Sequence, residues 1–178
     1  LAVGSSTENK TLPGTILEND VVIVGRASDE TLRFADITSA GWTSIIDTTS
    51  NGPGRSLAYK RMGSTPDSFI TIDQDPVAMT AGIIRVYRGV DTTTAIDAAI
   101  ATDTGSPGDP DPPSYTSVTD GALVLAFGLW DDDDTAGSAT APSGYGDLLA
   151  ADTGQSSTSV GATIALATLT KATAGAEN

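Results

Sequence analysis

Three aromatic side chains are the first residues of this chain whose types could do chemistry. Trp130, Tyr115 and Tyr145 all stand next to polar segments, and an exposed ring with a polar tip stacks well on a sugar. We therefore take these three residues as candidate glycan-binding residues. Tyr145 also follows a turn glycine, where an aromatic ring more often packs into a core, so Trp130 is the better candidate for an exposed ring.

The second candidate site consists of oxygen ligands. Four consecutive aspartates, Asp131, Asp132, Asp133 and Asp134, follow Trp130, and carboxylate oxygens are preferred ligands of Ca²⁺. The run lacks the alternating ligands, the glycine and the terminal glutamate of a calcium-binding loop. A solvated acidic loop is the simpler interpretation, and Ca²⁺ is kept as an alternative ligand of these aspartates.

The composition removes the common catalytic constellations. The chain has no Cys and no His, which excludes Ser-His-Asp and Cys-His catalysis and zinc held by histidine or thiolate. The aspartates gather in loops, and no feature isolates a pair of carboxylates for glycoside hydrolysis. The sequence therefore predicts a protein that is not an enzyme and that requires no cofactor.

The charge and the apolar runs of the chain exclude two classes of partner. Nine Lys and Arg residues stand against 23 Asp and Glu residues, a net charge of −14, and such a chain repels the phosphates of nucleic acid. No run approaches the roughly 20 apolar residues of a membrane-spanning helix. We expect neither nucleic acid nor membrane as a partner.

Two apolar runs organise the predicted fold. Residues 122–128 form an unbroken apolar run between turn residues, and Val21–Gly25 has the same form, as is typical of a strand buried on both faces. An offset of about 103 residues superimposes these runs and also places Gly41-Trp42 on Gly144-Tyr145. This internal similarity predicts two related halves, at about 14–102 and 114–178.

The many short β-type runs between turn residues predict an all-β fold. We expect a jelly-roll-like two-sheet sandwich in which residues 1–10 form an extended arm and residues 11–178 form a single domain built from the two halves. Thr92–Thr102 is the one helical candidate, because its alanines and isoleucines could form a stripe behind a capping residue.

The repeat also predicts a strand that the second half lacks. The last strand of the first half, Ala81–Arg88, would have its counterpart near position 184, beyond residue 178. We expect that a partner supplies this strand, that the sequence is a fragment, or that the second half closes differently. The first two are favoured because an unpaired edge invites association.

Several short segments of the chain resemble a known group of proteins. They include Leu57-Ala58-Tyr59-Lys60, Asp120-Gly121-Ala122-Leu123-Val124 and, as the most distinctive, Tyr87-Arg88-Gly89-Val90-Asp91. In these segments the chain resembles β-sandwich domains of structural proteins from tailed bacteriophages. The resemblance implies capsid decoration, cement, fibre or tail-associated modules without catalytic residues.

The expected function is therefore that of a structural protein at the virion surface, outside the cell. Such a module would form a homo-oligomer and would bind the capsid or tail scaffold of the same virion through strand edges and the N-terminal arm. The alternatives are a carbohydrate-binding module, with a glycan as partner, and a calcium-dependent extracellular adhesion module.

Overall fold

The computed structural model describes residues 6–28, 36–37, 39–47, 54–74, 80–103, 113–130, 138–154 and 161–177. Within these ranges twelve strands form four antiparallel sheets, and there is no α-helix. The strands are β1 (Ser6–Thr11), β2 (Val21–Ser28), β3 (Asp36–Ile37), β4 (Thr43–Asp47), β5 (Arg55–Arg61), β6 (Phe69–Gln74), β7 (Thr80–Tyr87), β8 (Tyr115–Ser117), β9 (Ala122–Trp130), β10 (Gly146–Asp152), β11 (Thr163–Lys171) and β12 (Gly175–Glu177).

The central sheet has the order β4-β5-β2-β7, and β2 lies between two hydrogen-bonded neighbours. Every residue of β2 is buried. Because side chains alternate between the faces of a strand, this burial requires a packed layer on both sides of the sheet. The apolar run at the start of β2 is therefore correctly predicted as a doubly buried strand.

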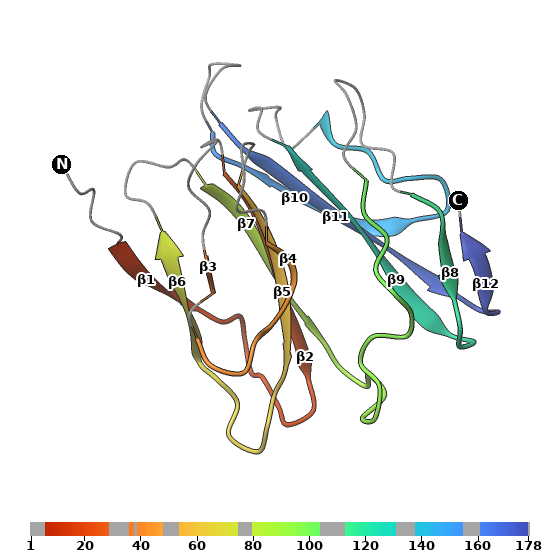
Figure 1. Ribbon diagram of the computed structural model, residues 1–178, viewed down its shortest axis with the longest axis horizontal. Coiled ribbons are helices and arrows are strands. Elements are labelled where there is room, and N and C mark those ends of the chain that lie inside the picture. The colour runs from red at the N-terminus through yellow and green to blue at the C-terminus, as the bar shows by residue number, and fades with distance from the viewer. Residues whose placement is uncertain are drawn as a thin grey trace.

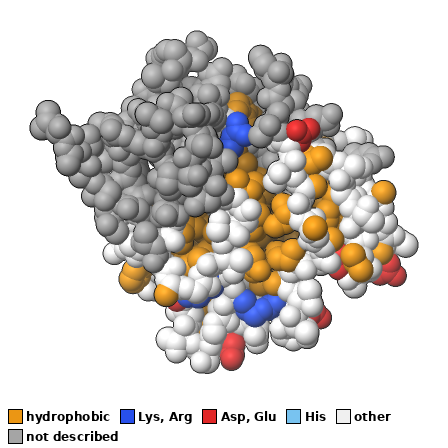
Figure 2. All heavy atoms as spheres, in the orientation of Figure 1, with side chains coloured by type: hydrophobic (Ala, Val, Ile, Leu, Met, Phe, Trp, Pro, Cys, Tyr) orange, Lys and Arg blue, Asp and Glu red, His pale blue; other side chains and the backbone are white. Residues whose placement is uncertain are grey.

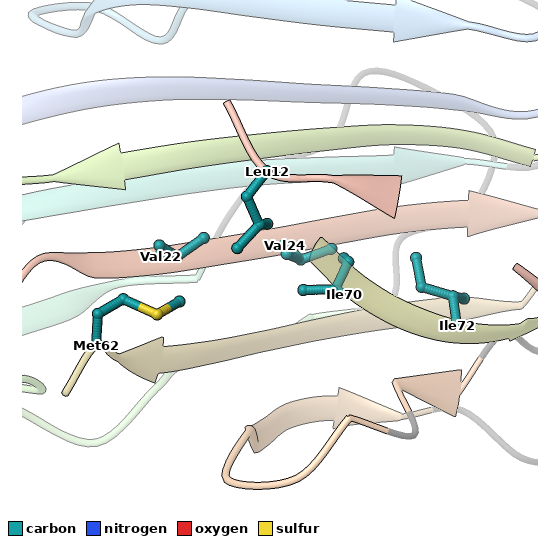
Figure 3. Close-up of a cluster of buried hydrophobic side chains, with 6 residues drawn as sticks. All are labelled: Leu12, Val22, Val24, Met62, Ile70 and Ile72. Atoms are coloured by element: carbon teal, nitrogen blue, oxygen red, sulfur yellow. The ribbon is translucent and has the colours of Figure 1, made fainter. Parts of the chain in front are cut away.

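The first of these layers is the sheet β1-β6-β3. Figure 3 shows Val22 and Val24 of β2 pointing toward Leu12, Ile70 and Ile72, with Met62 beside them. All six side chains are buried, and Trp42 packs at the margin of this cluster. Trp42 thus serves packing, as its position after a turn glycine predicts.

The second layer is the sheet β10-β11-β9, which packs on the opposite face of the central sheet. Ile164 and Leu166 of β11 are fully buried there, together with Ala27 and Ile83 of the central sheet. A Cβ atom on Gly25 would lie 2.8 Å from Ile164 Cδ1. The absence of a side chain at Gly25 therefore allows β2 to lie close to β11.

The burial predicted for the second apolar run is wrong. In β9 only Val124 is buried, and the other residues are partly or largely exposed. The reason is that β9 lies at an edge of its sheet, whereas β11 lies between β9 and β10. In this sheet the strand with six consecutive buried residues is β11.

Two long antiparallel ribbons fold back on themselves. In one, β2 pairs with β5 and the chain segments that continue from them pair again as β1 and β6. In the other, β9 pairs with β11 and their continuations pair as β8 and β12. At the second corner Gly121 N donates to Lys171 O at 2.7 Å, and Ala174 N donates to Asp120 Oδ1 at 2.7 Å.

Figure 1 shows the resulting order of layers along the long axis of the molecule: β1-β6-β3, then the central sheet, then β10-β11-β9, then β8 with β12. Ala165 and Ala167 alternate with Ile164 and Leu166 along β11, so they face away from the central sheet, and both are buried. Their burial agrees with a ribbon of β8 and β12 folded over that side.

The all-β prediction is confirmed, but the described strands form four sheets where two were expected. The helix predicted at Thr92–Thr102 is wrong, because this segment has no regular structure. Residues 6–10 of the predicted arm belong to β1, which pairs with β6. No helix within the described ranges is long and apolar enough to cross a membrane.

Candidate functional site

Two of the three predicted aromatic residues lie in one cluster. Tyr115 of β8 pairs across the ribbon with Glu177 of β12. Tyr145 stands just before β10, in a turn closed by a hydrogen bond from its N–H to Pro142 O at 3.0 Å, with Gly144 at a φ of 86°. Both rings are half-buried.

The hydroxyls of Tyr115 and Tyr145 interact electrostatically with each other. Burial raises the pKa of Tyr145, and the neighbouring Glu177 and Tyr115 raise it further. Burial also raises the pKa of Tyr115, with a smaller contribution from Asp97. Both phenols are therefore protonated at neutral pH, and each can donate a hydrogen bond to a ligand.

Lys171 completes this cluster. Its Nζ lies 2.8 Å from Glu177 Oε2 and donates to Ala176 O at 2.9 Å. The ion pair joins the end of β11 to β12, across the corner of the folded ribbon. We name Tyr115, Tyr145, Lys171 and Glu177 the tyrosine cluster.

Trp130 does not belong to the tyrosine cluster. It is the last residue of β9 and pairs with Thr163, whereas Lys171 pairs with Ala122 at the opposite end. Eight residue steps separate Ala122 from Trp130, which is about 26 Å in an extended strand. The predicted glycan-binding set is therefore split, with two tyrosines together and the tryptophan far from them.

The predicted calcium ligands Asp131, Asp132, Asp133 and Asp134 lie outside the described residues. In the part of the chain that is described, no group of three or more acidic, His or Cys side chains is arranged to hold a metal ion.

An ion pair between a buried carboxylate and a largely exposed guanidinium group is a feature that the sequence analysis missed. Asp20 precedes β2 and is 1 % exposed. Arg88 follows β7 and donates to both carboxylate oxygens of Asp20, at 3.0 Å from Nε and 2.9 Å from Nη2. Leu17 N donates to the same carboxylate at 2.9 Å. These three hydrogen bonds hold the pKa of Asp20 at about 2, with the Arg88 bond as the main cause.

The distinctive segment Tyr87-Arg88-Gly89-Val90-Asp91 contained the signal for this pair. Besides the Arg88 contact, Gly89 has a φ of 77°, and Val90 packs against the side of the core that contains Ile23 and Leu57. Asp91 Oδ1 accepts from Thr93 N and Thr94 N, both at 2.8 Å. The residues of this segment therefore have structural roles. Beside Arg88 lies a hollow of about 340 Å³ that is open to solvent.

This arrangement offers several groups that can contact a bound ligand. Two phenol rings, a carboxylate and an ammonium group match the apolar face and the hydroxyl groups of a sugar. No protein family, no curated protein and no solved structure matches this chain. The assignment of function therefore depends on the geometry alone.

Proposed function

We propose that this chain is a non-enzymatic structural module of a virion, located at the outer surface. It acts as capsid decoration or cement, or as a fibre module, and binds copies of itself and the capsid or tail scaffold. The observation that carries the proposal is the stack of antiparallel sheets, whose edge strands have a partner on one side only among the described residues; β9 is the longest of them. Such edges present backbone donors and acceptors to another chain.

The proposal extends to the finer fold. The two halves are related, and their folded ribbons are the basis of a jelly-roll-like sandwich. The matching strand orders β4-β5-β2 and β10-β11-β9 support this relation. So does the one-residue irregularity that β4 and β10 both carry in their pairing with β5 and β11.

The test is association with virions. An antibody against the purified chain is used to follow it through density-gradient fractions of lysates from cells that produce the corresponding phage. The chain should sediment with the particles at a fixed copy number and should be labelled on their outer surface. A chain found only among free proteins would contradict the proposal.

A second candidate function, carbohydrate binding, has its own support in the proximity of Tyr115 and Tyr145. In this case a glycan array identifies a ligand, and titration gives its affinity. Tyr115→Ala and Tyr145→Ala should each weaken binding by roughly tenfold, as expected for an aromatic residue that carries binding energy. Trp130→Ala is the matched control and should leave the affinity unchanged, since Trp130 lies at the far end of β9.

If all three aromatic variants weaken binding equally, the tyrosine cluster is not the glycan site. If no glycan binds, the structural role remains as the proposed function.

A further inference from the structure

One edge of the β10-β11-β9 sheet is unpaired. In the central sheet β2 has β5 on one side and β7 on the other. In the neighbouring sheet β9 pairs with β11 only, and within the described residues no strand occupies its other side. Among the described residues, the backbone groups along that side of β9 have no strand partner, and a further strand can pair with them.

Among the edge strands of the described sheets, β9 alone has no charged residue, has no register irregularity and is longer than three residues. The edge strands β4 and β10 carry register irregularities, β1 carries Glu8 and Lys10, β7 carries Arg85, and β3 has two residues. Charged residues, irregularities and shortness all protect an edge from association. By contrast, β9 is nine residues long, has no charge and no proline, and keeps an unbroken register with β11.

Exposed apolar side chains lie in β9 and in the segments that precede it along the chain. Val118, Ile100 and Leu123 are 71 %, 48 % and 44 % exposed, and Figure 2 shows a strip of hydrophobic side chains across the middle of the same face that Figure 1 displays. The 91–103 segment passes this region and is held by Asp97, which accepts from Val118 N at 2.7 Å. No backbone hydrogen bond joins the described residues of that segment to β9.

We propose that β9 pairs antiparallel with β9 of a second copy of this chain, around a twofold axis that passes beside Ala126. This inference deepens the proposed function and rests on it, because it names the edge and the partner through which copies of the module associate. Pairing would join two three-stranded sheets into one of six strands. A twofold contact of this kind requires a surface that is complementary to itself.

The sequence of β9 has this complementarity. In a register centred on Ala126, Trp130 lies opposite Ala122 and Val124 lies opposite Gly128. On the other face, Leu125 lies opposite Phe127 and Leu123 lies opposite Leu129. Large side chains thus meet small ones on one face, and apolar side chains meet on the other.

The choice of a second copy also agrees with the charge of the molecule. Two chains of net charge −14 repel each other over most of their surfaces. Because β9 has no charged residue, pairing through β9 places no like charges directly opposite each other. Pairing through β1 or β7 would bring charged residues into the contact.

The test combines native mass with single-cysteine cross-linking. The chain contains no cysteine, so Ala126→Cys introduces one thiol, which the twofold register places opposite its own copy. Paired residues have Cα atoms about 4.5–5.5 Å apart, within the range that a disulfide bridges. Ala122→Cys is the matched control, since its symmetry copy would be about 26 Å away along the strand.

The expected result is a native mass of twice the 18.0 kDa chain mass, with Ala126→Cys cross-linking at least about tenfold faster than Ala122→Cys. A monomer at about 100 μM concentration, well above the micromolar Kd of a moderate complex, would overturn the inference. A dimer in which both cysteine variants cross-link equally, or neither does, would also overturn it. The native mass of the unmodified chain keeps the test valid if a variant does not fold.

Failure of this inference is distinguishable from failure of the proposed function. A monomer that still sediments with virions retains the structural role and loses the β9 pairing. A β9-paired dimer that never associates with virions retains the pairing and loses the structural role.

Discussion

At the scale of the residue, the ion pair of Asp20 and Arg88 makes the stability of the fold depend on pH. The pKa of Asp20 is about 2, below its ordinary value of 3.8, because Arg88 and Leu17 N donate to the charged carboxylate. A lowered pKa in the folded state stabilises the fold above the ordinary value, and this contribution is lost as the pH falls from about 4 through about 2.

We predict that Asp20→Asn lowers the melting temperature at pH 7, because the neutral amide no longer pairs with the Arg88 charge. The difference between wild type and variant should shrink below pH 4 and nearly vanish near pH 2, as measured by thermal unfolding at several pH values. Lys10→Gln is the control, since it removes an exposed ion pair with Glu8, and such pairs contribute little. A difference that stays constant from pH 7 to pH 2 would contradict this account.

Gly25 provides a second test at the scale of one residue. A new Cβ would lie 2.8 Å from Ile164 Cδ1 and 3.2 Å from Phe127 Cε1, so the ends of these two side chains would have to shift. We predict that Gly25→Ala destabilises the fold by about 1–3 kcal/mol, the usual cost of overpacking, in urea unfolding. Gly63→Ala is the matched control, because no atom lies within 4 Å of its new Cβ. Equal stability of the two variants would show that the layers are not in close contact at Gly25.

At the scale of the element, residue patterns predicted which segments form strands better than they predicted where the strands lie. Apolar residues alternate at Ala162, Ile164 and Leu166, a pattern typical of a strand with one apolar face, and all three side chains are buried. The longer apolar run in β9 predicted a doubly buried strand, yet β9 is an edge strand. Composition does not reveal how many neighbours a strand has, because an apolar edge that pairs with another chain has the same composition as an interior strand.

The offset of about 103 residues illustrates a second limit. A gapless alignment places Gly25 on Gly128, but Gly25 faces Phe127 and Ile164. Gly128 is adjacent to Phe127 in β9, so the two lie on opposite faces. A shift of one residue moves every side chain of a strand to the other face. The faces of β2 and β9 therefore match only if the offset differs by one residue from that of the gapless alignment. The relation of the halves therefore remains a proposal.

The 91–103 segment shows why the predicted helix does not form. Asp91 accepts from Thr93 N and Thr94 N, as the cap of a helix would. The rest of the segment contains a further β-branched threonine, Thr102. Asp97 accepts from Val118 N and Thr119 N, which lie outside the segment. These distant contacts hold the segment against the folded ribbon. Tertiary hydrogen bonds have thus prevailed over a weak helical pattern.

We predict that Asp97→Ala releases the 91–103 segment without unfolding the core. The amides of Val118 and Thr119, whose acceptor is removed, should exchange with solvent faster, as should those of the segment. Amides in β2 and β11 should keep their wild-type rates, because local opening does not require the sheets to separate. Hydrogen exchange measured by mass spectrometry provides the comparison, and equal acceleration in β2 would contradict a local role for Asp97.

At the scale of the whole molecule, the candidate site combines residues that the sequence singled out with residues that it did not. Tyr115 and Tyr145 were chosen by residue type, and Tyr115 contributes to the raised pKa of Tyr145, whereas Trp130 lies at the far end of β9. Lys171 and Glu177 were not predicted as site residues, because the ribbon corner that brings them together joins segments that share no sequence motif. Charged residues that come together only in the folded chain, and that share no sequence motif, can be identified only from the structure.

The net charge of −14 leads to the last prediction, which also separates the calcium alternative from the structural role. All three lysines pair with acids, namely Lys10 with Glu8, Lys60 with Asp67 and Lys171 with Glu177, so the large excess of negative charge repels itself. Raising NaCl from about 10 mM to about 1 M shortens the screening length from roughly 30 Å to roughly 3 Å. We therefore predict that the melting temperature rises with salt.

In the calcium comparison, the two chlorides CaCl₂ and MgCl₂ are added at equal ionic strength. If the aspartates from Asp131 to Asp134 only add charge to a solvated loop, the two salts raise the melting temperature equally. If they bind Ca²⁺, micromolar CaCl₂ stabilises the chain where MgCl₂ does not, since a ligand that binds the native state alone must stabilise it. That second result would favour calcium-dependent adhesion, and a melting temperature that does not depend on salt would show that self-repulsion does not limit the stability of this acidic fold.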